Sequence, residues 1–174
     1  MNNSVEIESI IEQSIASAKE RNHEYCTLEH LLLALLMHVP FKKCVESYGA
    51  DVDSLTKEVG NYLDGLRAIQ VPIDQGQEIQ PRKTNSLERV INRSVTQVLF
   101  TGRKQVTTID LYLSILSENN SHAHYFLLKY GVTKNEFVPY WQKHYKGSEY
   151  TNNLTDSQAD EILEEYTINL TALA

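Results

Sequence analysis

Apolar residues recur every three to four positions along most of the chain, which is the pattern of helices that bury one face. Residues 5–21 are apolar on one face, whereas residues 28–37 are apolar nearly all round, as expected of a central core helix. Two further helices are predicted, one at about residues 41–48 and one that starts at Asp53, a candidate N-cap, and continues to about residue 66. The first part of the chain is therefore predicted to hold four helices.

The same pattern occurs a second time. Residues 26–36 read CTLEHLLLALL and residues 106–116 read VTTIDLYLSIL, so that Thr27 aligns with Thr107 at a distance of 80 positions. Further on, Gly49 aligns with Gly131 at a distance of 82 positions, so the second copy holds two additional residues. A match of this length indicates two copies of one helical unit.

Capping residues stand at the expected helix ends of both copies. Thr27 and Thr107 precede the two most apolar helices, where a hydroxyl can accept a hydrogen bond from the first turn. Ser121 is a candidate cap for the third helix of the second copy, and Gly49 and Gly131 suit the left-handed position that ends a helix. These residues support the predicted helix boundaries.

The second copy ends in a helix predicted at residues 134–144, which Pro139 is expected to shorten or kink. Residues 68–84, between the copies, lack periodicity and are predicted to form a surface loop. After about residue 147 the chain is polar and acidic, as in a flexible linker with at most one short helix at residues 156–166.

We therefore expect an all-α fold in which two pseudo-symmetric four-helix repeats form one compact domain. The expected boundaries are repeat one at about 1–67, loop 68–84, repeat two at about 85–146, the whole domain at 1–146 and an acidic linker at 147–174.

Composition narrows the class of protein. The chain has 174 residues, of which 41% are hydrophobic and 22% charged, so it can bury a core without disulfides or metals. The net charge of −7 argues against nucleic-acid binding, and residues 149–165 alone contribute −6 of it. The most apolar run, residues 31–39, is too short to span a membrane, and the N-terminus lacks a secretion signal. Cys26 and Cys44 are expected to be reduced core residues, so we predict a cytoplasmic protein.

Two long segments carry a family resemblance. ERNHEYCTLEHLLLALL, at residues 20–36, resembles the first repeat of the Clp ATPase N-terminal domain, and residues 85–132 resemble its second repeat. The HEYCTLEHLLLALL and SENNSHAHYFLL strings are most similar to the ClpA branch, the unfoldase subunit of the ClpAP protease, with the ClpC branch left open. The final residues, YTINLTALA, resemble the segment that enters the first ATPase module of this family.

The resemblance implies a fragment that recruits proteins rather than an enzyme. The chain contains no G-x-x-x-x-G-K-[ST] phosphate loop, so ATP and Mg²⁺ would belong to ATPase modules absent from it, and no cofactor is expected here. In the ClpA family this domain docks the ClpS adaptor and contacts protein substrates, whereas the Clp peptidase would be reached only through the absent ATPase ring. We expect the isolated domain to be monomeric. The alternative is a stand-alone Clp-N-like chaperone or peptide-binding protein.

Motif positions in the family nominate five residues for partner binding. Arg89 and Arg93 are spaced i, i+4, so they can present two guanidinium groups from one helical face, although a merely solvated face is the alternative. The other three are His23, Glu24 and Glu29. No physiological metal is expected, because H-E-x-x-H is absent, but relatives imply that His23 and Glu24 can bind zinc opportunistically.

Overall fold

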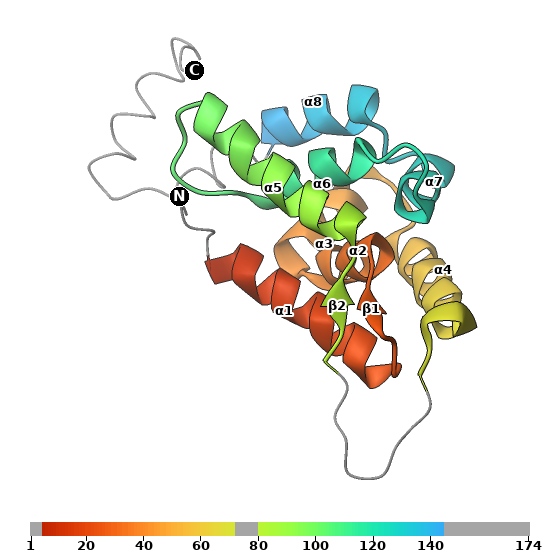
Figure 1. Cartoon of the computed structure of the whole chain (residues 1–174). Coiled ribbons are helices and arrows are strands. Elements are labelled where there is room, and N and C mark those ends of the chain that lie inside the picture. The colour runs from red at the N-terminus through yellow and green to blue at the C-terminus, as the bar shows by residue number, and fades with distance from the viewer. Residues whose placement is uncertain (1–4, 72–79, 145–174) are drawn as a thin grey trace.

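The computed structural model describes residues 5–71 and 80–144 as a helical domain (Figure 1). In these ranges the elements are α1 (Val5–Glu20), β1 (Tyr25–Cys26), α2 (Leu28–Met37), α3 (Val39–Tyr48), α4 (Val52–Asp64), a 3₁₀ turn η1 (Arg67–Ile69), β2 (Arg82–Lys83), α5 (Asn85–Phe100), α6 (Thr108–Leu116), α7 (His122–Lys129) and α8 (Lys134–His144). Helices α1–α4 come from the first copy and α5–α8 from the second, so the predicted four helices per copy are confirmed.

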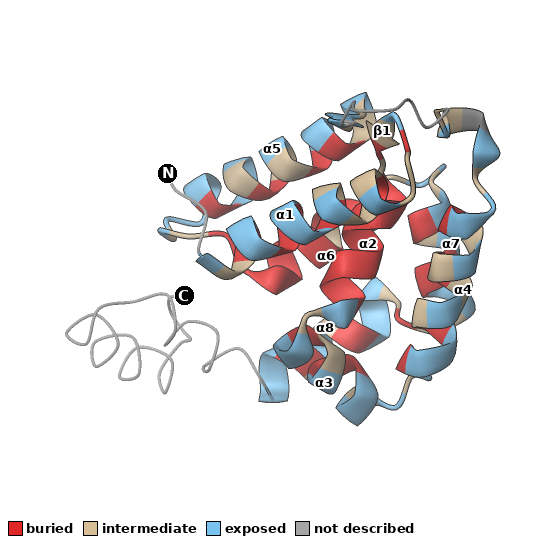
Figure 2. Cartoon of the chain, turned by 90° about the horizontal axis from the view of Figure 1, so that it is seen from below, coloured by how far each residue is buried: buried red, intermediate tan, exposed pale blue. Residues whose placement is uncertain are grey.

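The two most apolar helices form the centre of the molecule. Every residue of α2 except Met37 is buried, as is every residue of α6 except Leu113, and both helices lie inside the shell formed by the others (Figure 2). α2 and α6 contact each other, α1 and α5 pack against them as outer helices, and one continuous core joins the copies. Cys26 and Cys44 are part of that core, as predicted, and Trp141 of α8 also belongs to it.

The predicted caps form through a reciprocal arrangement. The side chain of His30 accepts the backbone N–H of Thr27 at 2.8 Å, and in the second copy the carboxylate of Asp110 accepts that of Thr107 at 2.8 Å. Each third residue of the helix thus satisfies a donor that precedes the first turn. Ser121 caps α7 by accepting the amide of His124 at 3.0 Å, so that prediction is confirmed.

Left-handed backbone recurs at matched positions of the two copies. Gly49 and Gly131 have φ values of 111° and 75° after α3 and α7, as predicted. The turns after α1 and α5 also match, since Asn22 has a φ of 57° where Gly102, 80 positions later, has 72°. Asparagine and glycine both tolerate this conformation, so the two turns have the same shape despite different residues.

Some helix boundaries differ from the sequence prediction. α3 begins at Val39, two residues before the predicted start. The N-cap of α4 is Asp51, whose carboxylate accepts the amide of Ser54 at 3.1 Å, and Asp53 lies in the first turn. The prediction of Asp53 as the cap was wrong because two aspartates in that stretch suit the role equally well. α8 continues through Pro139 to His144.

The predicted loop at 68–84 contains regular structure at both ends. The 3₁₀ turn η1 follows α4, and β2 pairs in parallel with β1, with Tyr25 opposite Arg82 and Cys26 opposite Lys83. Strands of two residues carry no readable period, which is why the sequence did not predict them. No helix in the described ranges is long and apolar enough to cross a membrane. Residues 147–174, with the helix predicted at 156–166, lie outside the described residues.

Candidate functional site

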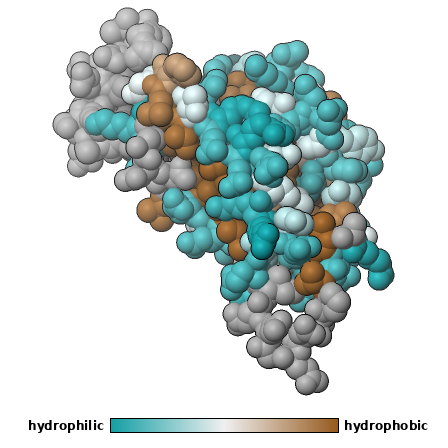
Figure 3. Space-filling view, in the orientation of Figure 1, coloured by the Kyte–Doolittle hydropathy of each residue, from teal (hydrophilic) through white to brown (hydrophobic). Residues whose placement is uncertain are grey.

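The parallel strand pair joins the turn that carries Glu24 to the segment that leads into α5. The carbonyl of Glu24 accepts the amide of Arg82 at 2.9 Å, and the amide of Thr84, the N-cap of α5, donates to the carbonyl of Cys26 at 3.1 Å. Glu24 is exposed at this junction, and α5 begins two residues after β2. The hydrophilic surface over the middle of α5 is visible in Figure 3. We use the name α5 surface for the candidate surface predicted to include Glu24, Arg89 and Arg93.

The two arginines of the α5 surface converge on one carboxylate. Arg89 donates to Glu118 at 2.6 and 3.0 Å, and Arg93 donates to the same carboxylate at 2.7 Å and to the carbonyl of Ser114 at 2.9 Å. The side chain of Glu118 is 10% exposed, and the hydrogen bonds from Arg89 lead the effects that lower its pKa to about 2. Arg89 is 52% exposed and Arg93 32%. The trio therefore keeps one surplus positive charge at the surface.

His23 lies in the interior, where it pairs with His30. His30 Nδ1 accepts the Thr27 amide, so its Nε2 carries the proton and donates to His23 Nδ1 at 2.9 Å. Both rings are at most 1% exposed, and burial lowers the pKa of each, that of His30 to about 3. The pair is therefore neutral at pH 7. Because His23 is buried, we do not assign it to the accessible surface.

An ion pair occupies the equivalent place in the second copy. Arg103 and Asp110 stand 80 positions after His23 and His30, and their groups meet at 2.5 and 3.0 Å. The side chain of Asp110 is 3% exposed. Both pairs connect the turn after the outer helix to the cap of the central helix. This shared geometry indicates that the His23–His30 pair stabilises the fold and is not a ligand-binding site.

Glu29 is also buried, and it joins the two copies. Its carboxylate accepts the backbone N–H of Ala123, in the first turn of α7, at 2.9 Å, and Glu29 is only 7% exposed. Beside it, Tyr62 of α4 stacks on His122 of α7 with ring centroids 4.5 Å apart. A negative charge at a helix N-terminus is favourable, so Glu29 acts as a cap across the domain. We therefore do not assign Glu29 to the accessible surface.

Metal binding gains no support within the described ranges, where no group of three His, Cys, Asp or Glu side chains could hold an ion. Glu24 points outward, whereas the ring of His23 is buried and its Nδ1 already accepts a hydrogen bond. Zinc at His23 and Glu24 therefore lacks a third ligand in the part of the chain described.

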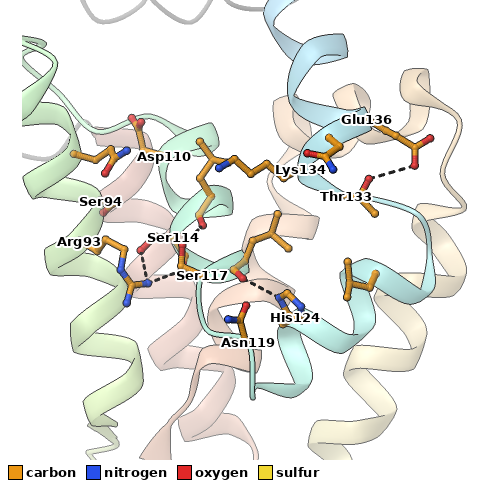
Figure 4. Close-up of a pocket in the computed structure, with 15 residues that line it drawn as sticks. Arg93, Ser94, Asp110, Ser114, Ser117, Asn119, His124, Thr133, Lys134 and Glu136 are labelled. Atoms are coloured by element: carbon orange, nitrogen blue, oxygen red, sulfur yellow. Dashed lines mark hydrogen bonds between the residues drawn. The ribbon is translucent and has the colours of Figure 1, made fainter.

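The sequence analysis missed two features of this region. Glu118, which binds both arginines, follows α6 in a polar turn, and no motif distinguishes it from other surface acids. An open groove of about 780 Å³ also lies beside Arg93, between α5, α6 and the start of α8 (Figure 4). Its residues are separated by up to 43 positions in the chain, so only packing brings them together.

Comparisons with known proteins agree with this architecture. The chain is 33% identical over 132 residues to a "ClpA homolog protein" of Fuscovulum blasticum, a match that covers 76% of this chain and 16% of that protein. The chain thus spans about a sixth of the length of that relative.

Solved structures share the fold at low sequence identity. The N-terminal domain of Hsp104 from Candida albicans is 13% identical with a TM-score of 0.66, over 80% of this chain and 89% of that one. The N-terminal domain of ClpD from Arabidopsis thaliana is 17% identical with a TM-score of 0.61, over 83% and 94%. Residues 2–130 match the Clp repeat (R) N-terminal domain family. The paired four-helix copies and this match together show that the chain belongs to the Clp repeat N-terminal domain family.

Proposed function

We propose that this chain is the adaptor- and substrate-recruiting domain of a ClpA-like ATP-dependent unfoldase, acts in the cytoplasm and docks a ClpS-type adaptor through the α5 surface. The observation that supports the proposal is the pair of arginines, Arg89 and Arg93, that α5 presents at the surface with one surplus positive charge. The junction of the two copies at β1 and β2 joins the turn that carries the exposed Glu24 to the segment that leads into this helix. The family match and the similarity to a ClpA homolog point to the same role.

The chemistry of the α5 surface suits a protein partner with both acidic and basic groups. Arg89 is half exposed and is held in place by Glu118, so little side-chain freedom is lost when a partner carboxylate approaches. Glu24 offers an exposed carboxylate on the neighbouring strand junction. Charges at the rim of an interface mainly set association rate and specificity, so we expect an interaction that weakens as salt rises.

The test is a titration of the chain with a purified ClpS-type adaptor, in which binding is measured by isothermal calorimetry. The double variant Arg89→Ala/Arg93→Ala and the single variant Glu24→Ala should weaken binding by about tenfold and about threefold, the effects of losing exposed charge pairs. Lys43→Ala/Lys57→Ala is the matched control, since both lysines are exposed and lie on α3 and α4.

The outcomes separate the function from the site. An adaptor that fails to bind the unaltered chain refutes the adaptor role. Binding that all the variants retain unchanged keeps the role and places the interface elsewhere.

The alternative, a chaperone or peptide-binding protein, is favoured by one observation. Leu99 and Phe100 at the end of α5 are 57% and 86% exposed, and apolar surface gathers in that region (Figure 3). Exposed apolar patches are typical of sites that bind other proteins. Suppression of aggregation of an unfolded test protein by this chain, abolished in Leu99→Ser/Phe100→Ser, would support the alternative.

A further inference from the structure

The corner between α2 and α3 exposes large apolar side chains. Met37 and Val39 are 63% and 56% exposed. Glu6 in the first turn of α1 pairs with His38 of this corner at 3.5 Å, so the start of α1 lies beside it. We call this surface the first patch, and its apolar residues, all of them exposed, are Val5, Met37, Val39 and Pro40. Exposed apolar groups that lie together are typical of surfaces that bind other proteins.

A second apolar patch lies at the end of α5, where Leu99 and Phe100 are exposed. We call these two residues the second patch. The two outer helices run in opposite directions, so that α1 begins and α5 ends on the same side of the molecule, whereas α7 lies on the opposite side (Figure 1 and Figure 2). A single partner molecule can therefore contact both patches.

The fold requires neither patch, because the other copy has polar residues at the matching places. The corner between α6 and α7, residues 117–121, reads SENNS, and Asn85 stands 80 positions after Val5. Lys19 and Glu20 stand 80 positions before the second patch. Since the two copies fold alike, packing of the repeat does not account for apolar residues at these exposed positions. We therefore attribute them to contact with another molecule.

The α1 side of the first patch is acidic. Glu6 and Glu8 stand in the first turn of α1, Glu8 is exposed, and residues 5–18 contain no Lys or Arg. The α3 side holds charges of both signs: Lys42, Lys43, Glu46 and Asp53, of which Lys42 and Asp53 pair at 3.8 Å. The excess negative charge at the first patch is therefore on α1.

The surroundings of the second patch have the opposite sign. Residues 89–109 contain no Asp or Glu. Arg103 pairs with the buried Asp110, whereas Lys104, four positions after Phe100, is exposed. Lys104 thus provides a cation beside the second patch that complements the acidic start of α1.

We propose that two copies of this chain pair through these surfaces, with the first patch of each copy against the second patch of the other. A two-fold arrangement makes both contacts at once, because the patches lie on the same side of the molecule. Apolar side chains are then removed from water, and Glu8 of each copy lies near Lys104 of the other. This inference goes beyond the recruiting function and does not use Arg89 or Arg93.

The pairing is weak, because the patches together offer few apolar residues and small interfaces are transient. We expect half of the chains to pair on the order of 0.5 mM, so that the chain stays monomeric at low micromolar concentrations. Small-angle X-ray scattering of the full chain from about 0.05 to about 1 mM measures this. The apparent mass should rise from 19.9 kDa toward that of two chains and no further.

Variants of the two patches test which surfaces meet. Met37→Ser/Val39→Ser and Leu99→Ser/Phe100→Ser should each raise the Kd of pairing about tenfold. An equimolar mixture of these two variants retains one intact contact, between the first patch of one and the second patch of the other. The mixture should therefore pair about threefold more tightly than either variant alone, a recovery that also requires both variants to be folded.

Charge exchange tests the polar contact in the same assay. Glu8→Lys and Lys104→Glu should each raise the Kd about threefold, and the variant that carries both changes should return to the original Kd. Leu128→Ser is the matched control, since it removes an exposed leucine from α7 on the opposite side of the molecule and should leave pairing unchanged.

A mass that stays at one chain up to about 1 mM would overturn the proposal, as would an equal loss of pairing in Leu128→Ser. Pairing that both patch variants lose and their mixture does not regain would show that each patch contacts its own counterpart, and would also overturn it. Growth beyond two chains would contradict the two-fold arrangement. The adaptor titration at micromolar concentration examines the monomer, so its failure would remove the adaptor role and leave this inference in place.

Discussion

Glu29 is expected to stabilise the domain because it caps a helix of the other copy. Replacement by alanine removes a charged acceptor 2.9 Å from the buried amide of Ala123. Hydrogen bonds to charged groups contribute about 1.5–3 kcal/mol, so we expect the free energy of unfolding to fall by about 2 kcal/mol. In a domain of this size the Tm should fall by roughly 4–8 °C.

Chemical denaturation of three variants tests this expectation. Glu29→Gln retains an acceptor but no charge, so it should cost about half as much as Glu29→Ala. Glu24→Ala removes an exposed carboxylate and should change the free energy of unfolding by less than about 0.5 kcal/mol.

Hydrogen exchange adds a local measurement, since the Ala123 amide should lose protection in Glu29→Ala. If Glu29→Ala costs no more than Glu24→Ala, or if exchange at Ala123 stays unchanged, the capping role is refuted.

Three other results are expected. The buried histidine pair, whose pKa values lie below 6.5, must take up protons as the chain unfolds, so stability should fall as the pH drops from 6.5 toward 3. His30 alone should lower it by about 2 kcal/mol at pH 5, and His23→Gln/His30→Asn should remove the loss between urea titrations at pH 6.5 and pH 5. Glu118, with its pKa lowered to about 2, contributes stability above pH 4.5 that is lost toward pH 2, and Glu118→Gln should abolish that dependence. Because Glu118 holds Arg89 in place, the same variant should weaken calorimetric binding of the adaptor, and unchanged or tighter binding would count against the α5 surface. Burial raises the pKa of the Cys26 thiol to about 11 and also shields Cys44. Neither thiol should therefore react with a thiol reagent at pH 8 before urea unfolds the domain. Prompt labelling would show that this part of the core opens.

Helix positions were predictable because their signals are local. The three-to-four-residue period, the threonine caps and the glycines after α3 and α7 all act within one or two turns. The start of α4 was not predictable, because Asp51 and Asp53, two positions apart, offered equivalent caps. The two-residue strands were not predictable, because a strand pair depends on residues far apart in the chain.

The candidate site was predictable only in part. The spacing of Arg89 and Arg93 shows that they share a face of α5, but it does not show that Glu118, 25 positions after Arg93, binds both. His23 and Glu29 look like surface residues in the sequence because they are polar. Their burial depends on partners in other elements, which local patterns do not specify.

The sequence by itself determined that two copies of a four-helix unit form this protein and which helix of each copy is central, because repetition and periodicity are properties of the chain alone. The tertiary structure decided which polar groups are available. Glu29 accepts an amide 94 positions away, and Lys134 is left without a partner among the described residues. Both results depend on how the copies pack, since desolvation and charge pairing depend on distance in space rather than on distance along the chain.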